Sequence, residues 1–198
     1  MPRVRVEYFR TWSVPLSEVV MDTYRPSLGI PVEELDTPSF IVDMDSVEHN
    51  FRVVSEAFGN SDCKMREHAK NIKSPFLARM QIDTGGTVGG VCCAKVSEAE
   101  AMLMGGITDL LVPNQIVPRD KIRRLCSLAR HGDIKVCVDD PINVKDISEV
   151  AVCEGVTIGI LIEVHTGMNR AGIRNMKGGV ELARLIEELP GVEFRGVM

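Results

Sequence analysis

Two lysines follow a histidine in the segment REHAKNIKSP, residues 66–75, and either could supply an amine for covalent chemistry. Lys70 comes two residues after His68, and Lys73 directly precedes a Ser-Pro pair that is typical of a helix start. A lysine at the end of a core strand is either a surface charge or a nucleophile that forms a Schiff base. We expect Lys70 at the last strand position, at the rim of an apolar core, and Lys73 in solvent.

A second candidate segment is HTGMNRAG, residues 165–172, which places Asn169 and Arg170 between glycines. The glycines predict a tight loop in which the backbone approaches another group closely, and a plain turn is the alternative. An arginine in such a loop, together with a nucleophilic lysine, is compatible with Schiff-base chemistry.

Further polar residues follow the apolar runs of the chain, each with a structural alternative. Lys95 either faces a site or simply ends a strand. Asn114 either faces a site or forms a turn, and Gln115 comes directly after it. Asp139 and Asp140 either face a site or cap the next helix. Because the carboxyl ends of parallel strands share one edge, we expect these groups on the same rim as Lys70.

The elements that must position these residues alternate along the chain. Apolar runs typical of buried strands occupy residues 88–94, 109–113, 134–139, 157–164 and 192–198, after an earlier strand over 38–46. Helical patterns occupy residues 45–60, 74–82, 97–106, 118–132, 143–155 and 178–191, and a capping box from Ser97 to Glu100 opens the third of these. Strands apolar on both faces, joined by helices, predict a parallel sheet.

Two α/β architectures fit this alternation, a TIM-type (β/α) barrel and an open doubly wound sheet. The dinucleotide fingerprint G-x-G-x-x-G follows no strand, which favours the barrel. With the run before Lys70, the chain supplies about six of the eight strands of a barrel, which typically needs about 250 residues. The sixth run reaches Met198. We therefore expect the N-terminal portion of a C-terminally truncated barrel over 37–198, preceded by an extension over 1–36.

Composition narrows the function class. The net charge of −5 argues against a nucleic-acid partner. A membrane span needs about 20 consecutive apolar residues, and the sequence contains no such run. The first twenty residues are charged and have no signal-peptide core, so we expect a cytoplasmic protein. The six cysteines form no C-x-x-C pair and are expected to be free, buried thiols in a reducing cytosol rather than a disulfide or zinc framework.

Four segments taken in order carry a family resemblance that covers about residues 35–198. They are LDTPSFIVDMDSVEHNF, REHAKNIKSP, GVCCAKVSEAEAMLMGGITDLLV and HTGMNRAGIR. Together they resemble the alanine-racemase-like, fold type III pyridoxal-phosphate enzymes. The branch that looks nearest contains D-threonine aldolase, hydroxyaspartate aldolase and D-serine dehydratase.

The resemblance implies a cofactor site in this chain. Lys70 of the His-x-Lys motif would carry pyridoxal 5'-phosphate as the internal aldimine, beside His68. Arg170 would face the phenolic oxygen of the cofactor, with Asn169 next to it. The sequence departs from the branch at Glu67, usually proline, and at His165, usually aspartate.

Two further departures lie at positions 71 and 72 between the lysines, where the branch has threonine or a similar residue followed by histidine and this chain has Asn71 and Ile72. All of these positions lie near the expected cofactor, so they bear on the choice of substrate and on activity.

The resemblance also implies a reaction. A full-length parent would be a homodimeric lyase that cleaves D-configured β-hydroxy amino acids to glycine plus an aldehyde or oxo acid. It would use a divalent metal whose ligands, like the phosphate-binding loops and the C-terminal β-domain, lie beyond this chain, so no metal ligand is assigned here. D-serine or D-threonine dehydration and racemisation are the alternatives with the same lysine. A non-catalytic pyridoxal-phosphate carrier is the alternative of another class.

Overall fold

The computed structural model describes residues 27–198, and its contacts divide the chain into two units, with the boundary between Val42 and Asp43. The expected extension therefore lies partly outside the described residues. The described part of the first unit contains one short 3-10 helix, η2 (Val32–Glu34), and no strand.

The strand predicted over residues 38–46 is wrong. Residues 38–43 form no strand in the described structure, and helix α1 (Met44–Phe58) already begins within the predicted segment. The physical reason is the cap: the side chain of Asp43 accepts a hydrogen bond from the N–H of Ser46 at 3.2 Å and starts the helix there. β-branched and aromatic residues before the cap favour a strand, but residues 38–43 pair with no strand among the described residues.

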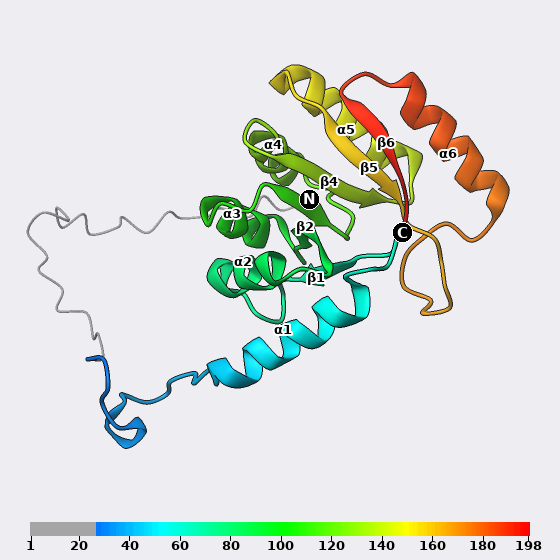
Figure 1. The fold of residues 1–198 in the computed structure, drawn as a ribbon. Coiled ribbons are helices and arrows are strands. Elements are labelled where there is room, and N and C mark those ends of the chain that lie inside the picture. The colour runs from blue at the N-terminus through cyan, green and yellow to red at the C-terminus, as the bar shows by residue number, and fades with distance from the viewer. Residues whose placement is uncertain (1–26) are drawn as a thin grey trace, which may run out of the picture. The chain divides into compact units, whose positions relative to one another are not determined.

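The second unit alternates strands and helices, as the sequence predicts (Figure 1). Its strands are β1 (Met65–His68), β2 (Thr87–Cys92), β3 (Asp109–Val112), β4 (Asp133–Val138), β5 (Ile158–Ile162) and β6 (Val192–Val197). Its further helices are α2 (Pro75–Thr84), α3 (Val96–Met104), α4 (Arg119–Leu128), α5 (Pro141–Glu154) and α6 (Met176–Glu188).

The order of the strands decides the architecture. All six strands are parallel and pair in sequence order, β1-β2-β3-β4-β5-β6. An open doubly wound sheet reverses its order at a switch point, whereas a (β/α) barrel adds each strand beside the previous one. Figure 1 shows the helices on the outer side of the curved sheet. The prediction of a barrel-type N-terminal portion is confirmed.

The core lies between the sheet and its helices. It contains fully buried side chains from the strands and from the helices that cover them, among them Leu110, Val136, Ile160, Ile122 and Ile147. These are the apolar positions whose spacing predicts the elements, so packing and pattern agree.

The six cysteines are all free in the structure, but the prediction that they are buried is wrong for Cys63 and Cys153, which are exposed. Three of them are fully buried, and burial raises the pKa of Cys93 and of Cys137 to about 12 and that of Cys126 to about 11. Thiols with such high pKa values remain protonated at neutral pH, so these three are packing residues rather than nucleophiles.

A layer of charged side chains lines the inner face of the sheet near the amino ends of the strands. Arg66 of β1 makes two hydrogen bonds of 2.9 Å with Asp109 of β3, and Lys135 of β4 donates to the same carboxylate at 2.7 Å. Gly90 of the intervening strand β2 leaves room for this pair, because a Cβ there would lie 2.4 Å from the Cγ of Asp109. Since side chains alternate along a strand, His68 shares the inner face with Arg66.

The start of α3 differs from its prediction. The capping box expected to begin at Ser97 is wrong, because the helix begins one residue earlier, at Val96, and its N-cap is Lys95. The carboxylate of Glu98 accepts a hydrogen bond from the N–H of Ala94 at 2.8 Å and satisfies a donor at this helix start. The acidic residue at this helix start is therefore Glu98, whereas the predicted partner, Glu100, accepts hydrogen bonds from Arg124.

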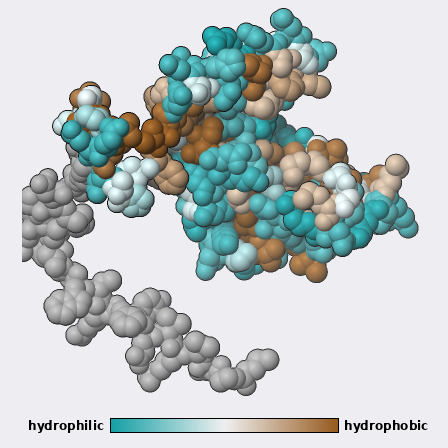
Figure 2. Space-filling model, turned by 90° about the horizontal axis from the view of Figure 1, so that it is seen from below, coloured by the Kyte–Doolittle hydropathy of each residue, from teal (hydrophilic) through white to brown (hydrophobic). Residues whose placement is uncertain are grey.

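The surface seen in Figure 2 is largely hydrophilic, with separate hydrophobic patches. Several exposed apolar side chains stand where helices begin, including Phe76 of α2, Ile142 of α5 and Met176 of α6. Among residues 27–198, no helix has the length and apolar character that crossing a membrane requires.

Candidate active site

Lys70 lies at the carboxyl end of β1, but not on the strand itself. Pairing between β1 and β2 ends at His68, and Lys70 stands in the turn two residues further on, so its predicted place at the last strand position is wrong. The last hydrogen bond to β2 runs from the N–H of Ala69 to the Cys92 carbonyl at 2.8 Å, and the chain turns directly after it. Within the described residues, the exposed Lys70 side chain has no hydrogen bond or ion pair.

His68 supports this turn from the strand side. Its Nδ1 lies 3.4 Å from the backbone N–H of Lys70, and its carbonyl accepts a hydrogen bond from the N–H of Asn71 at 3.2 Å. Burial lowers the pKa of His68, and the positive charge of Lys70 lowers it further. The imidazole is therefore neutral at pH 7 and adds no positive charge beside the amine.

Lys73 occupies a different environment. Its N–H donates to the Ala69 carbonyl at 2.7 Å, and its φ of 50° places it in the left-handed region. The next residue, Ser74, is the N-cap of α2 and accepts from the N–H of Leu77 at 3.3 Å, as predicted. Lys73 thus ends the turn beside a helix start. Its side chain is exposed, but so is that of Lys70, so the expected difference in solvation between the two lysines is absent.

A second group of polar side chains gathers after β5. Glu163 follows the strand directly and is only 7% exposed. Its Oε2 accepts a hydrogen bond from the Gln115 side chain at 2.5 Å, and its Oε1 lies 3.8 Å from a guanidinium nitrogen of Arg170. Glu163 and Arg170 line a hollow of about 210 Å³ together with Met168 and Met198.

Glu163 is a site residue that the sequence analysis missed. It is the next-to-last residue of a long apolar run, TIGILIEV, where a charged residue is easily taken as the polar end of a strand. The available signal was its position directly after a buried parallel strand, which is where functional groups gather in this architecture. Its burial and its bond to Gln115 come from tertiary contacts between separate loops.

Asn169 is held mainly by its own loop. Its φ of 53° is left-handed, its N–H donates to Nε2 of His165 at 3.1 Å, and its side-chain oxygen accepts from Arg174 at 2.7 Å. The predicted tight loop is present, and a β-bridge between Val164 and Ile173 closes it. The side-chain amide nitrogen of Asn169 has no hydrogen-bond partner among the described residues.

The remaining rim residues have mostly structural partners. Asn114 donates to the Ala94 carbonyl at 2.8 Å, so it joins two loops. Asp140 is the N-cap of α5, as its structural alternative predicts. Lys95 is the exposed N-cap of α3, and β2 already ends at Cys92, so the alternative that Lys95 ends the strand is wrong. Asp139 caps nothing, and its carboxylate accepts from the loop after β5.

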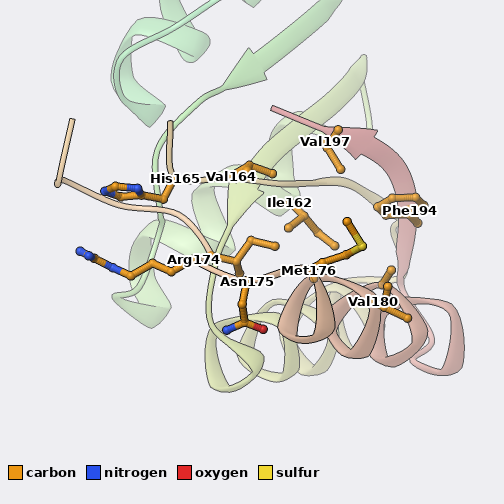
Figure 3. A pocket seen from close by; sticks show the side chains of 12 residues that line it. Ile162, Val164, His165, Arg174, Asn175, Met176, Val180, Phe194 and Val197 are labelled. Carbon is orange, nitrogen blue, oxygen red and sulfur yellow. The ribbon is translucent and has the colours of Figure 1, made fainter. Parts of the chain in front are cut away.

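A larger cavity, of about 510 Å³, lies against α6 beside β5 and β6 (Figure 3). Ile162, Val180, Phe194 and Val197 form apolar walls, and the polar side chains of its lining stand toward one end in Figure 3. An apolar wall supplies no group for bond cleavage, so volume is a poor guide here. We place the candidate site at the rim that carries Lys70, Glu163 and Arg170.

The residues at this rim fit pyridoxal phosphate better than they fit a metal ion. The amine of Lys70 is free to react with an aldehyde, and the guanidinium of Arg170, 63% exposed, can meet an anionic oxygen. Among the described residues, no group of three or more His, Cys, Asp or Glu side chains could hold a metal ion.

Comparison with known proteins identifies the family of the chain. Residues 42–198 match the family described as alanine racemase, N-terminal domain. The chain belongs to this family. The match begins next to the first residue of the compact second unit, so family and fold cover the same part of the chain.

Within the family, the chain is similar to two aldolases. It is 38% identical over 170 residues to 3-hydroxy-D-aspartate aldolase of Paracoccus denitrificans, an alignment covering 85% of this chain and 44% of the relative. It is 37% identical to D-threonine aldolase of an Arthrobacter species, with the same coverage. The solved D-threonine aldolase of Filomicrobium marinum superimposes with a TM-score of 0.82 at 38% identity, covering 87% of this chain and 46% of that structure. The chain thus spans less than half the length of these relatives.

Proposed function

We propose that the complete protein is a pyridoxal-phosphate-dependent lyase that cleaves D-configured β-hydroxy amino acids into glycine and an aldehyde or oxo acid. The observation that carries the proposal is the pair of aldolases, named for 3-hydroxy-D-aspartate and D-threonine, at 37–38% identity over most of this chain. The unpaired amine of Lys70 at the rim supports it. Because the match covers only 44% of each relative, the activity is proposed for the complete protein and not for residues 1–198 alone.

Each rim residue has a proposed role. Lys70 would hold the cofactor covalently through its ε-amine, and neutral His68 would keep the neighbourhood free of a second positive charge. Arg170 would donate to the phenolic oxygen of the cofactor, and Glu163, whose carboxylate accepts a hydrogen bond from Gln115, would orient Arg170. The free amide nitrogen of Asn169 is available as a further donor to the cofactor.

The bound pyridinium ring supplies the electron sink that makes cleavage between Cα and Cβ possible. This chain contributes binding and orientation: it carries the Lys70 amine after β1 and the Arg170 guanidinium after β5, both at the carboxyl ends of parallel strands. Since no metal-holding group of side chains occurs in residues 27–198, we derive no step through a metal ion.

In the deciding experiment, the complete protein is loaded with pyridoxal phosphate. Separate samples are then incubated with 3-hydroxy-D-aspartate or with D-threonine. Cleavage gives glycine with glyoxylate from the first substrate and glycine with acetaldehyde from the second, in equal amounts. Release of ammonia with an oxo acid would instead identify a dehydratase, and inversion at Cα a racemase. Cofactor binding with none of these products would identify a carrier and overturn the proposal.

We expect Arg170→Ala to weaken pyridoxal-phosphate retention and to raise the pKa at which the bound cofactor titrates. The guanidinium favours the ionised phenolic oxygen, so its removal favours the protonated form. Cofactor affinity and the pH dependence of the visible absorbance measure the two effects. Arg174→Ala, which removes the arginine that hydrogen-bonds to Asn169, is the matched control and should change both quantities less. A loss of substrate affinity alone would contradict the role given to Arg170.

A further inference from the structure

Two consecutive aspartates follow β4, and the structure gives them different partners. Oδ1 of Asp140 accepts a hydrogen bond from the N–H of Ile142 at 2.7 Å and caps α5. Oδ2 of Asp139 accepts from the N–H of Gly172, also at 2.7 Å, although Gly172 lies 33 residues further along the chain. Only Asp140 therefore serves the helix, and Asp139 is available for another task.

Gly172 belongs to the loop after β5, two residues beyond Arg170. Its φ of +98° is left-handed, and a Cβ at this position would lie 2.6 Å from the backbone nitrogen of His165. The two arms of the loop can approach this closely only because residue 172 is glycine. The amide of Gly172 then donates to the end of the neighbouring strand, β4.

The loop tip, residues 166–172, makes its other polar contacts with its own flanks, residues 163–165 and 173–175. Within the part of the chain that the structure describes, the bond to Asp139 is the only hydrogen bond or ion pair that ties the loop tip to another segment. Arg170 itself does little to hold the loop tip. Its side chain is 63% exposed, and its ion pair with Glu163 is 3.8 Å long. Because the Arg170 end of this pair stands in solvent, the pair can orient the side chain but contributes little to holding the loop, whose position depends on its backbone contacts.

We propose that Asp139 is a positioning residue that fixes the loop after β5 and thereby holds Arg170 at the rim. The expected effect on the cofactor rests on the proposed function, because Arg170 is the residue assigned to the cofactor there. The tether itself depends only on the contact between the Asp139 carboxylate and the Gly172 amide. A hydrogen bond from a backbone N–H to an ionised carboxylate is of the stronger kind, which suits a single tether.

The first test needs no cofactor. Trypsin cleaves after Arg170 and Arg174, and cleavage requires the loop to leave its closed position. In the cofactor-free complete protein we expect Asp139→Ala to accelerate cleavage at these bonds about tenfold, because the open population rises when the tether is lost. Asp139→Asn keeps an acceptor of the same size without the charge and should fall between Asp139→Ala and wild type. Asp140→Ala is the matched control: it removes a helix cap, lowers the melting temperature, and leaves loop cleavage unchanged.

The second test loads the same variants with pyridoxal phosphate. We expect Asp139→Ala to weaken cofactor affinity several-fold and to shift the pH titration of the bound cofactor in the direction given by Arg170→Ala. In the Arg170→Ala background, the Asp139→Ala change should have almost no further effect on either quantity, because its influence passes through Arg170. A merely structural role would lower stability without moving the titration.

The outcomes separate the two proposals. Unchanged loop cleavage in Asp139→Ala, or equal acceleration in Asp140→Ala, would overturn the tether whatever the cofactor does. Faster cleavage that leaves cofactor affinity and titration as in wild type would overturn the positioning of Arg170 toward the cofactor. A protein whose Lys70 takes up no cofactor would refute the proposed function, while the cleavage result would still decide the tether.

Discussion

Replacement of Lys70 by alanine is expected to abolish covalent retention of pyridoxal phosphate in the complete protein, together with the visible absorbance of the bound cofactor. The reason is the position of its amine, which stands at the carboxyl rim with no partner in the described residues. Lys73→Ala is the matched control and should retain the cofactor. Lys73 lies only three residues further on, but it sits between the turn and the N-cap of α2.

The measurement is borohydride reduction of the cofactor-loaded protein followed by peptide mapping. Reduction converts the linkage to a stable secondary amine, so the pyridoxyl group marks the lysine that held the cofactor. The mark is expected on Lys70 alone. A mark on Lys73, or on Lys95 at the start of α3, would show that the assignment is wrong.

The fold follows from the sequence because its signals are local and repeated. Each apolar run became a parallel strand, and each helical pattern became a helix within a few residues of its predicted bounds. The choice between barrel and open sheet required strand order, which no local pattern contains. The wrong strand over 38–46 shows the limit of such local signals. The β propensity of residues 38–42 predicts extended chain, but a strand also needs a partner strand. A single capping residue, Asp43, decided where the helix starts.

The site was only partly predictable, for a different reason. Lys70 and Arg170 stand beside recognisable local features, a strand end and a glycine loop. Glu163 acquires its role from Gln115, 48 residues away in the chain, and Asp139 from a loop that follows the next strand. Spacing alone cannot distinguish a capping aspartate from a tethering one, because both types of residue follow a strand and precede a helix. Their hydrogen-bond partners exist only in the folded chain.

Glu67 presents the sharpest conflict between sequence and packing. It lies on β1 between two residues that face the inner side of the sheet, so its side chain points to the opposite side. It is 8% exposed, and neither carboxylate oxygen has a hydrogen-bond partner among the described residues. Burial raises the pKa of its carboxyl, because an unpaired charge is costly away from water.

We expect Glu67→Met to stabilise the chain at neutral pH by about 1–3 kcal/mol, the usual cost of a buried polar group left unsatisfied. Methionine has a similar volume and no polar oxygen, so packing is retained while the desolvation cost disappears. Glu67→Gln removes the charge but leaves a buried amide, and it should recover only part of the gain. Glu187→Gln on the exposed face of α6 is the control for the loss of one negative charge, and it should change stability little.

The pH dependence gives this prediction its sign. A carboxyl whose pKa is higher in the folded state binds more protons there than in the unfolded chain, where its pKa is about 4.3. The contribution of Glu67 to the free energy of unfolding is therefore fully present below about pH 4. It is lost as the pH rises through the raised pKa that the carboxyl has in the folded state. Urea unfolding of wild type and Glu67→Met at pH 4 and pH 8 measures the difference, which should be large at pH 8 and smaller at pH 4. A difference that is the same at both pH values, or a less stable Glu67→Met at pH 8, would mean that the Glu67 carboxylate is not an unpaired buried charge.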